Sequence, residues 1–276
     1  MPSDPSVGYT EATERCTGRC GQVSSPMMRS LLSGVRAALT FAVGIPITAI
    51  CAVMVILITL VRPTSPVLDA IARFWGRTWC WASGVKLVVE GLEHVEPNKA
   101  YVVVSNHRSA FDIFAHFAAM PFPIRFLAKS ELFKIPLFGM AMSRIGMVEV
   151  DRKAGRAAHY AINEGARKTM ERGWSLMIYP EGTRPRDGVM LPFKKGAFSI
   201  ARKLGAPILP TAIIGSRAVW KPKTKIIRSG RVTVKIMEPI PTEGVRIYEV
   251  DGLRNRAHTQ IGEAVDQAPL VRHGTR

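Results

Sequence analysis

The sequence lacks the short motifs that identify several well-known enzyme classes. Its 276 residues contain no G-x-x-x-x-G-K-[ST], no G-x-G-x-x-G after a predicted strand, no G-x-S-x-G and no H-E-x-x-H. These absences argue against a P-loop nucleotidase, a dinucleotide-binding domain, an α/β-hydrolase and a zinc protease of the H-E-x-x-H type. Any chemistry must therefore be carried by other residues.

Cysteine is also scarce. Cys16 and Cys20 lie in a polar tail, whereas Cys51 and Cys80 lie in apolar surroundings. Because these four cysteines have no regular spacing and no histidine neighbour, they predict neither a disulfide scaffold nor a metal site.

Acidic residues are outnumbered, with 21 Asp and Glu against 38 Lys and Arg, which gives a formal charge of +17. Such an excess fits a nucleic acid or an anionic membrane surface as partner, or simply a solvated basic surface. The sequence contains no recognisable nucleic-acid-binding module. We therefore expect an anionic membrane surface and no nucleic acid.

Charge is absent altogether between Ala37 and Val61. This run meets the roughly 20-residue length that a bilayer-crossing helix needs, and it starts too late and runs too long for a signal peptide. Pro46 leaves open whether it spans the bilayer or re-enters. The aromatic, amphipathic stretch Pro66–Ser83 that follows suits a membrane interface or a helix packed on a soluble domain. We expect a disordered tail over 1–34 and a membrane-associated helical segment over 35–84.

From Val85 onward, short β-rich runs alternate with helical ones, which predicts an α/β domain over 85–266 before a tail over 267–276. Its central sheet should be largely parallel or mixed and covered by helices. Predicted strands are Lys86–Val89, Tyr101–Ser105, Arg125–Ala128, Met147–Val150, Leu176–Tyr179, Ile208–Ile213 and Arg231–Met237. Predicted helices are Phe111–Met120, Glu131–Arg144, Arg156–Arg172, Phe193–Leu204 and Val245–Val265. The second of these helices can also begin later, with Pro136 in its first turn.

Ligands of such folds bind at the carboxyl ends of strands. The first unusual segment in such a position is NHRSAFD, which follows the predicted strand Tyr101–Ser105. His107 and Asp112 are five positions apart, so they can meet only if the chain turns between them. Ser109 is a good N-cap for that turn. The pair is either a base with its orienting carboxylate or a capping box beside a loop histidine, and Asp112 can serve in both.

Two further segments follow predicted strands. In the first, Gly182 allows close backbone approach to a ligand, while Thr183 and Arg184 can bind a phosphate, although a solvated surface turn has the same composition. In the second, Asp151 and Arg152 end a strand, where Asp151 can also cap the next helix.

These segments together resemble the glycerolipid acyltransferases, and in particular the 1-acyl-sn-glycerol-3-phosphate (lysophosphatidate) acyltransferases. The resemblance covers roughly residues 85–241 and depends on the order and spacing of four blocks. Glu149 departs from the pattern, because the family more often has an apolar or aromatic residue there, where it can tune the acceptor pocket. The blocks are NHRSAFD, AKSELFKIPLFGMAMSRIGMVEVDR, YPEGTRPRDG and GAPILPTAI.

The resemblance implies a role for each matching residue. His107 would be the general base for the acceptor hydroxyl, and Asp112 would orient its imidazole. Lys129 is a candidate donor to the tetrahedral oxyanion. The acceptor-binding residues would be Glu181, Gly182, Thr183 and Arg184, with Arg184 on the phosphate and Arg152 assisting.

The implied reaction transfers a fatty acyl group from acyl-CoA or acyl carrier protein to a lysophospholipid. Because the thioester is already activated, no metal and no cofactor beyond this co-substrate is expected. The expected location is a membrane, such as a bacterial inner membrane with the active site at its cytoplasmic face. A different lysolipid acceptor, such as a lyso-ornithine lipid, and an inactive membrane-binding protein of the same fold are the alternatives.

Overall fold

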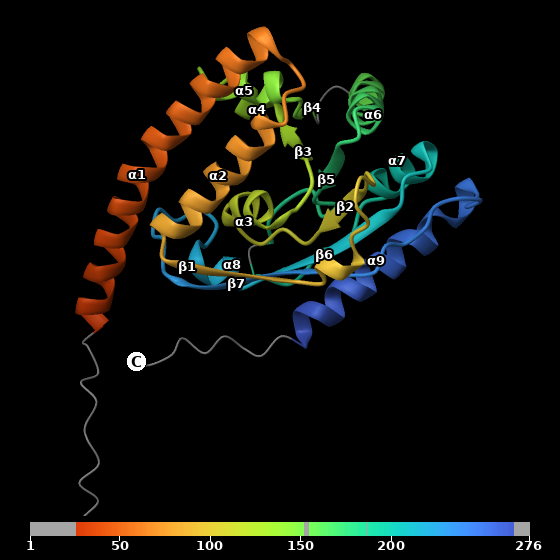
Figure 1. Cartoon of the computed structure of the whole chain (residues 1–276). Helices are drawn as coiled ribbons and strands as arrows, with labels where there is room; N and C mark the ends of the chain where they lie inside the picture. Colours follow the sequence, from red (N-terminus) through yellow and green to blue (C-terminus); the bar gives the residue numbers. More distant parts are fainter. Residues whose placement is uncertain (1–25, 152–154, 186, 268–276) are drawn as a thin grey trace, which may run out of the picture.

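The N-terminal part of the chain is a helical pair. The structure, a computed structural model, describes residues 26–151, 155–185 and 187–267. Helix α1 (Pro26–Val61) begins before the predicted boundary at residue 35 and continues through Pro46 without a break. A short turn connects it to α2 (Val67–Ala82), and the two helices lie side by side along one flank of the molecule (Figure 1).

The rest of the described chain is built around a seven-stranded sheet with the order β1-β7-β6-β2-β5-β3-β4. All neighbouring strands are parallel except β6 and β7, so the expected mixed, mainly parallel sheet is confirmed. All seven predicted strands are present to within one residue. They are β1 (Val85–Glu90), β2 (Val102–Ser105), β3 (Ile124–Lys129), β4 (Val148–Val150), β5 (Ser175–Ile178), β6 (Ile208–Ile214) and β7 (Gly230–Ile236).

Helices cover both faces of this sheet (Figure 1). On one face, α3 (Phe111–Ala119) packs between the sheet and α2. On the other face lie α6 (Gly155–Glu171), α7 (Gly196–Leu204) and α9 (Val250–Asp266). The short helices are η1 (Leu92–His94), α4 (Ser130–Phe133), α5 (Phe138–Ile145), α8 (Ser216–Val219) and η2 (Ile247–Glu249).

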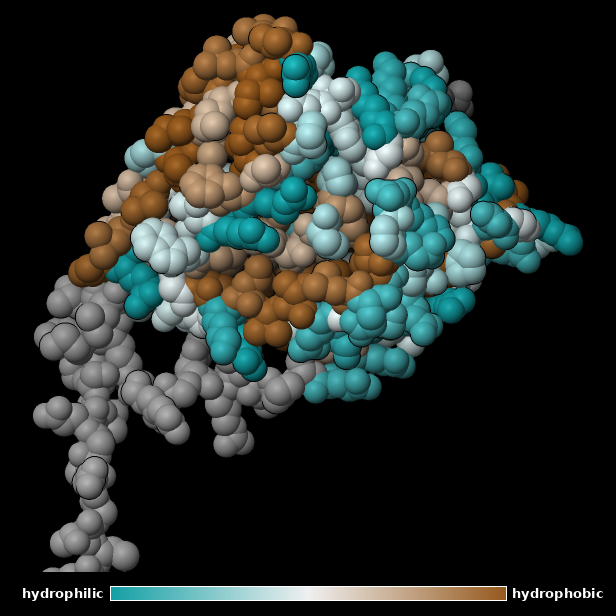
Figure 2. All heavy atoms as spheres, viewed as in Figure 1, coloured by the Kyte–Doolittle hydropathy of each residue, from teal (hydrophilic) through white to brown (hydrophobic). Residues whose placement is uncertain are grey.

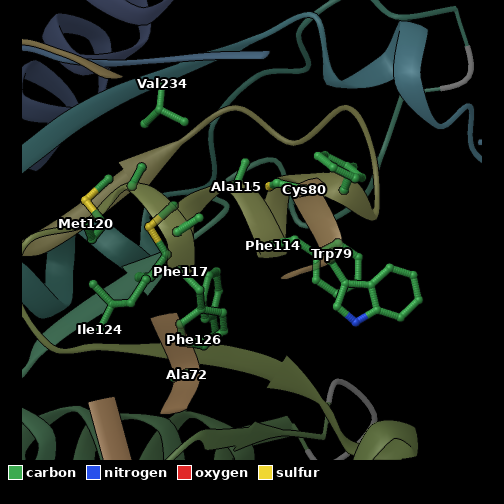
Figure 3. Packing of buried hydrophobic residues seen from close by; sticks show 14 of the residues in the cluster. Ala72, Trp79, Cys80, Phe114, Ala115, Phe117, Met120, Ile124, Phe126 and Val234 are labelled. Carbon is green, nitrogen blue, oxygen red and sulfur yellow. The ribbon is translucent and has the colours of Figure 1, made fainter. Parts of the chain in front are cut away.

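An aromatic core joins the helical pair to the α/β domain. In Figure 3, Phe114 and Phe117 of α3 point toward Trp79 and Ala72 of α2. The Trp79 and Phe114 rings stack with centroids 4.5 Å apart. Burial of such large apolar rings is the main stabilising term in a core, so α2 is part of the folded domain.

Three helix predictions were wrong in their bounds. The predicted helix Val245–Val265 begins as α9 only at Val250, after the short helix η2. The predicted helix over Glu131–Arg144 is divided into α4 and α5, because Leu137 has a φ of 63° and the preceding Pro136 disfavours helical geometry before it. Pro136 therefore lies between the helices and not in a first helical turn. Helix α7 begins at Gly196, three residues later than predicted, because the Lys194 N–H donates to the Pro180 carbonyl in the loop after β5 at 2.9 Å.

Candidate active site

The segment NHRSAFD lies at the centre of the sheet's carboxyl edge. Strand β2 has β6 on one side and β5 on the other. The chain leaves β2 toward α3 on one face, whereas it leaves β5 toward α7 on the opposite face. In open α/β sheets, a crevice forms where neighbouring strands diverge in this way, and ligands bind there. His107 and Glu181 follow these two strands.

His107 and Asp112 are in direct contact. The His107 Nδ1 lies 2.8 Å from the Asp112 Oδ2. Because a carboxylate accepts hydrogen bonds, Nδ1 carries the proton and Nε2 keeps its lone pair. The His107 side chain is 16% exposed, whereas that of Asp112 is fully buried. This arrangement presents a base nitrogen at the surface, held in one tautomer by a carboxylate behind it.

Asp112 also shapes the turn that brings the pair together. Its Oδ2 accepts hydrogen bonds from the backbone N–H groups of Arg108 and Ser109, at 2.8 and 2.9 Å. The Ser109 hydroxyl accepts one from the Phe111 N–H at 3.0 Å. Asp112 lies in the first turn of α3, where the helix dipole favours a negative charge. The base-and-carboxylate geometry and the capping geometry therefore coexist.

Asn106 anchors the loop to the sheet, a contact that the sequence analysis did not assign. Its side-chain amide donates to the Ile213 carbonyl at 2.9 Å and accepts from the Ile213 N–H at 2.8 Å. These two hydrogen bonds extend the pairing of β2 with β6 beyond the end of β2, through a side chain in place of the backbone. Asn106 is fully buried. The position of the next residue, His107, is fixed as a result.

Glu181 binds the protein's own backbone. Its Oε1 accepts a hydrogen bond from the His107 N–H at 2.7 Å, and its Oε2 accepts one from the Leu191 N–H at 2.9 Å. The residue is only 2% exposed, and burial raises the pKa of its carboxyl group. Both oxygens thus help to join the loops after β2 and β5, and a contact of Glu181 with an acceptor stays a prediction.

The loop after β5 exposes the other predicted binding residues. Thr183 and Arg184 are exposed, so Arg184 is accessible to an anionic group. Gly182 has a φ of +72°, and a Cβ there would lie 3.1 Å from the Lys194 ammonium nitrogen. Lys194 is not among the predicted binding residues, and its position against this glycine places a second cation beside the loop of Arg184.

Arg217 is a further cation at this loop that the sequence analysis missed. It follows β6 in α8 and donates from Nη1 to the Pro185 carbonyl at 3.0 Å. A Cβ on Gly188 would lie 2.9 Å from its Nε. No sequence motif marks this arginine, because the contact depends on how two distant loops meet.

Of the remaining predicted residues, Lys129 lies farther along the same edge. Lys129 ends β3, which is separated from β2 by β5, and its ammonium group pairs with Glu131 at 2.7 Å. Arg152 lies outside the described residues. Glu149 lines a cavity of about 280 Å³ together with Lys168 and Trp174, and Trp174 directly precedes β5, toward the amino edge of the sheet. Among the described residues no group of three or more potential metal ligands occurs.

Fold and site together define an α/β protein with a His–Asp pair at the carboxyl edge of its sheet. The family described as "Acyltransferase" matches residues 86–214. A coconut (Cocos nucifera) protein named 1-acyl-sn-glycerol-3-phosphate acyltransferase is 32% identical over 88% of this chain and 80% of its own length. This chain therefore belongs to the acyltransferase family, and the resemblance stated from the sequence is confirmed.

Two other similar proteins have the same kind of name. The sheep (Ovis aries) 1-acyl-sn-glycerol-3-phosphate acyltransferase alpha is 34% identical over 63% of this chain. The chain spans 60% of that relative's length. The crystal structure of the 1-acyl-sn-glycerophosphate (LPA) acyltransferase PlsC from Thermotoga maritima superposes with a TM-score of 0.75. It is 25% identical and covers 87% of this chain and 97% of its own.

Proposed function

We propose that this protein transfers a fatty acyl group from a thioester to the free hydroxyl of 1-acyl-glycerol-3-phosphate, giving phosphatidic acid. The observation that carries the proposal is the His107–Asp112 contact of 2.8 Å in a member of the acyltransferase family. The names of the similar proteins support the same acceptor. The donor is acyl-CoA or acyl carrier protein.

The chemistry starts at the His107 Nε2. This nitrogen takes the proton of the acceptor hydroxyl while the hydroxyl oxygen attacks the thioester carbonyl carbon. Asp112 stabilises the imidazolium that forms. The tetrahedral intermediate then breaks its C–S bond, and the imidazolium returns the proton to the departing thiolate. General-base assistance of this kind contributes roughly 10²–10⁴ in rate.

Cations at the same edge complete the proposed site. The negative charge that develops on the carbonyl oxygen needs a donor, for which Lys129 at the end of β3 is the candidate. Arg184 binds the acceptor phosphate through its planar fork, and Lys194 adds positive charge beside the same loop. Glu181 acts on binding indirectly, because it holds the loops together.

We further propose that α1 lies in the plane of the membrane and does not cross it. The segment Ser33–Val61 is long and apolar enough to span a bilayer. However, one stripe of α1 is buried against the protein between residues 37 and 59, through Ala37, Thr40, Gly44, Cys51, Ala52, Val55 and Thr59. A spanning α1 would draw the attached domain into the bilayer, whereas an in-plane α1 buries only its exposed apolar face.

The test of the proposed reaction is an acceptor panel. Wild type, His107→Ala and Arg184→Ala are purified in detergent, supplied with a long-chain acyl-CoA, and assayed for thiol release with each lysolipid. We expect release that depends on lysophosphatidic acid and on His107. Arg184→Ala should raise KM for lysophosphatidic acid far more than KM for acyl-CoA.

The other outcomes separate the alternatives. Release only with a phosphate-free acceptor, such as a lyso-ornithine lipid, would replace the proposed substrate. Release that persists in His107→Ala would remove the assigned base. Failure with every acceptor, and again with acyl carrier protein as donor, would favour an inactive membrane-binding protein.

A further inference from the structure

The imidazole of His107 is covered on one face by a tyrosine ring. Tyr179, the residue directly after β5, stacks on His107 with ring centroids 4.0 Å apart and planes 11° from parallel. The edge of the imidazole that carries Nδ1 is held by Asp112. One face of the His107 ring is therefore in contact with Tyr179, and its Nδ1 edge is in contact with Asp112.

The hydroxyl group of Tyr179 is in contact with a second histidine, His116. His116, one turn after Asp112 in α3, is fully buried, and its Nδ1 lies 2.7 Å from the Asp112 carbonyl oxygen. Because a carbonyl only accepts, this Nδ1 carries a proton, which it shares with the Tyr179 hydroxyl oxygen at 3.1 Å. Burial lowers the pKa of His116 to about 4, so its ring is neutral at pH 7. His116 of α3 thus contacts the Tyr179 hydroxyl, and the Tyr179 ring in turn stacks on His107, the base on the loop after β2.

We propose that Tyr179 is a positioning residue that holds the His107 imidazole in plane and stabilises its cationic form by stacking. The proposal rests on the proposed function, in which His107 becomes an imidazolium during the reaction. The face of an aromatic ring attracts a cation within about 6 Å of its centroid. The attraction is stronger for the imidazolium than for the neutral ring, so it favours the transition state over the ground state.

The stacking predicts a specific kinetic pattern. Tyr179→Leu removes the ring and should lower kcat roughly tenfold. It should leave KM for the acyl donor and for the acceptor within about twofold of wild type, because the tyrosine contacts the base and not the phosphate loop. Tyr179→Phe keeps the ring but loses the link to His116, so it should recover most of that loss.

Phe126 provides the matched control. It lies on β3, is 6% exposed, and its ring centroid lies 5.9 Å from that of Tyr179. Phe126→Leu removes a similar aromatic volume from the same cluster without removing a ring stacked on His107. We expect this variant to lose thermal stability, as Tyr179→Leu does, but to keep kcat within about twofold.

The outcomes distinguish this proposal from the proposed function. If wild type shows no His107-dependent turnover, the proposed function fails, and the role of Tyr179 fails with it. Active wild type together with an undiminished kcat in Tyr179→Leu would overturn only the positioning role. Equal losses of kcat in Tyr179→Leu and Phe126→Leu would also overturn it, because they would show an effect of packing. Should Tyr179→Leu not fold, a Tyr179→Phe enzyme as slow as His107→Ala would contradict the importance of the ring.

Discussion

At the scale of single residues, one oxygen of the buried Asp112 carboxylate both stabilises the turn before α3 and binds the His107 imidazole. Its Oδ2 accepts from His107, Arg108 and Ser109, while its Oδ1 is buried without a hydrogen-bond partner among the described residues. An asparagine fits the same space and can present its single carbonyl oxygen to the same donors. What it cannot supply is the negative charge opposite the imidazolium.

Asp112→Asn should therefore fold and lose turnover by roughly 10²–10⁴. The measurement is steady-state thiol release together with the melting temperature in detergent. Asp266→Asn, which removes a carboxylate at the end of α9, serves as the control and should behave as wild type. Near wild-type turnover in Asp112→Asn would show that the pair has only a capping role.

His116 links protonation to stability. Its pKa is lowered from 6.5 to about 4, first because burial disfavours the charged ring. Unfolded chains take up a proton near pH 6.5, whereas the folded protein resists protonation until about pH 4. The stabilising contribution of the neutral ring is therefore complete above pH 6.5 and is lost as the pH falls toward 4.

Comparison with His116→Asn, which keeps a donor near the Nδ1 position and does not titrate, isolates this effect. The difference in free energy of unfolding between wild type and variant should shrink by about 2–3 kcal/mol from pH 7.5 to pH 4.5. Denaturant unfolding at the two pH values measures it. A difference that stays constant would mean that His116 titrates normally in the folded protein.

At the scale of elements, the strands were predictable because β-branched runs bounded by Gly, Pro and Asn have a strong local signal. The break at Leu137 was not, because a leucine rarely adopts a positive φ and its sequence carries no signal for one. The same limit applies to the site. The turn that joins His107 to Asp112 follows from Ser109 and local spacing, whereas the inward position of Glu181 depends on a backbone N–H 74 residues away.

The contact between α1 and α2 depends on small residues and one hydroxyl. A Cβ on Gly44 would lie 2.5 Å from the Trp79 ring, so the helices approach closely only at glycine. The Thr48 hydroxyl accepts hydrogen bonds from both Trp75 and Trp79, at 2.8 and 3.2 Å, and donates to the Gly44 carbonyl. One side chain thus satisfies two indole N–H groups in an apolar contact.

Thr48→Val keeps the shape of the side chain but removes the acceptor for both indoles. Both hydrogen bonds are half-buried, so losing their acceptor costs less than the roughly 1–3 kcal/mol of a fully buried donor, and we expect a loss of stability of about 1 kcal/mol. Thr48→Ser retains the hydroxyl and is the matched control. Tryptophan fluorescence during denaturation measures both, and equal stability of the two variants would contradict a structural role for these hydrogen bonds.

At the scale of the whole molecule, the surface is divided by hydropathy. Figure 2 shows apolar atoms gathered over α1, while polar side chains dominate the surface over α6 and α9. The exposed apolar side chains of α1 include Leu39, Ile50 and Leu57. Exposed apolar surface this extensive is typical of an interaction site. The proposed partner is an anionic lipid surface, and the net charge of +17 supports this proposal.

The proposed in-plane orientation of α1 predicts how the protein should bind to and leave a membrane. A variant with Leu39→Gln, Ile50→Gln and Leu57→Gln keeps the buried stripe of α1 and loses much of its apolar outer face. Each large apolar side chain moved from water contributes about 1.5–3 kcal/mol, so binding to vesicles containing anionic lipid should weaken roughly 100-fold or more. Co-sedimentation measures this, with the melting temperature in detergent as the check on folding.

The control variant changes three exposed side chains on the opposite face of the sheet, Tyr160→Gln, Ile247→Gln and Tyr248→Gln. We expect its vesicle binding to match wild type, because α6 and η2 lie away from the helical pair. Carbonate at high pH releases interfacial proteins and retains spanning ones, so wild type should be extracted. Wild type that stays with the membrane in carbonate would contradict the in-plane orientation, because a helix that crosses the bilayer is not extracted by this treatment.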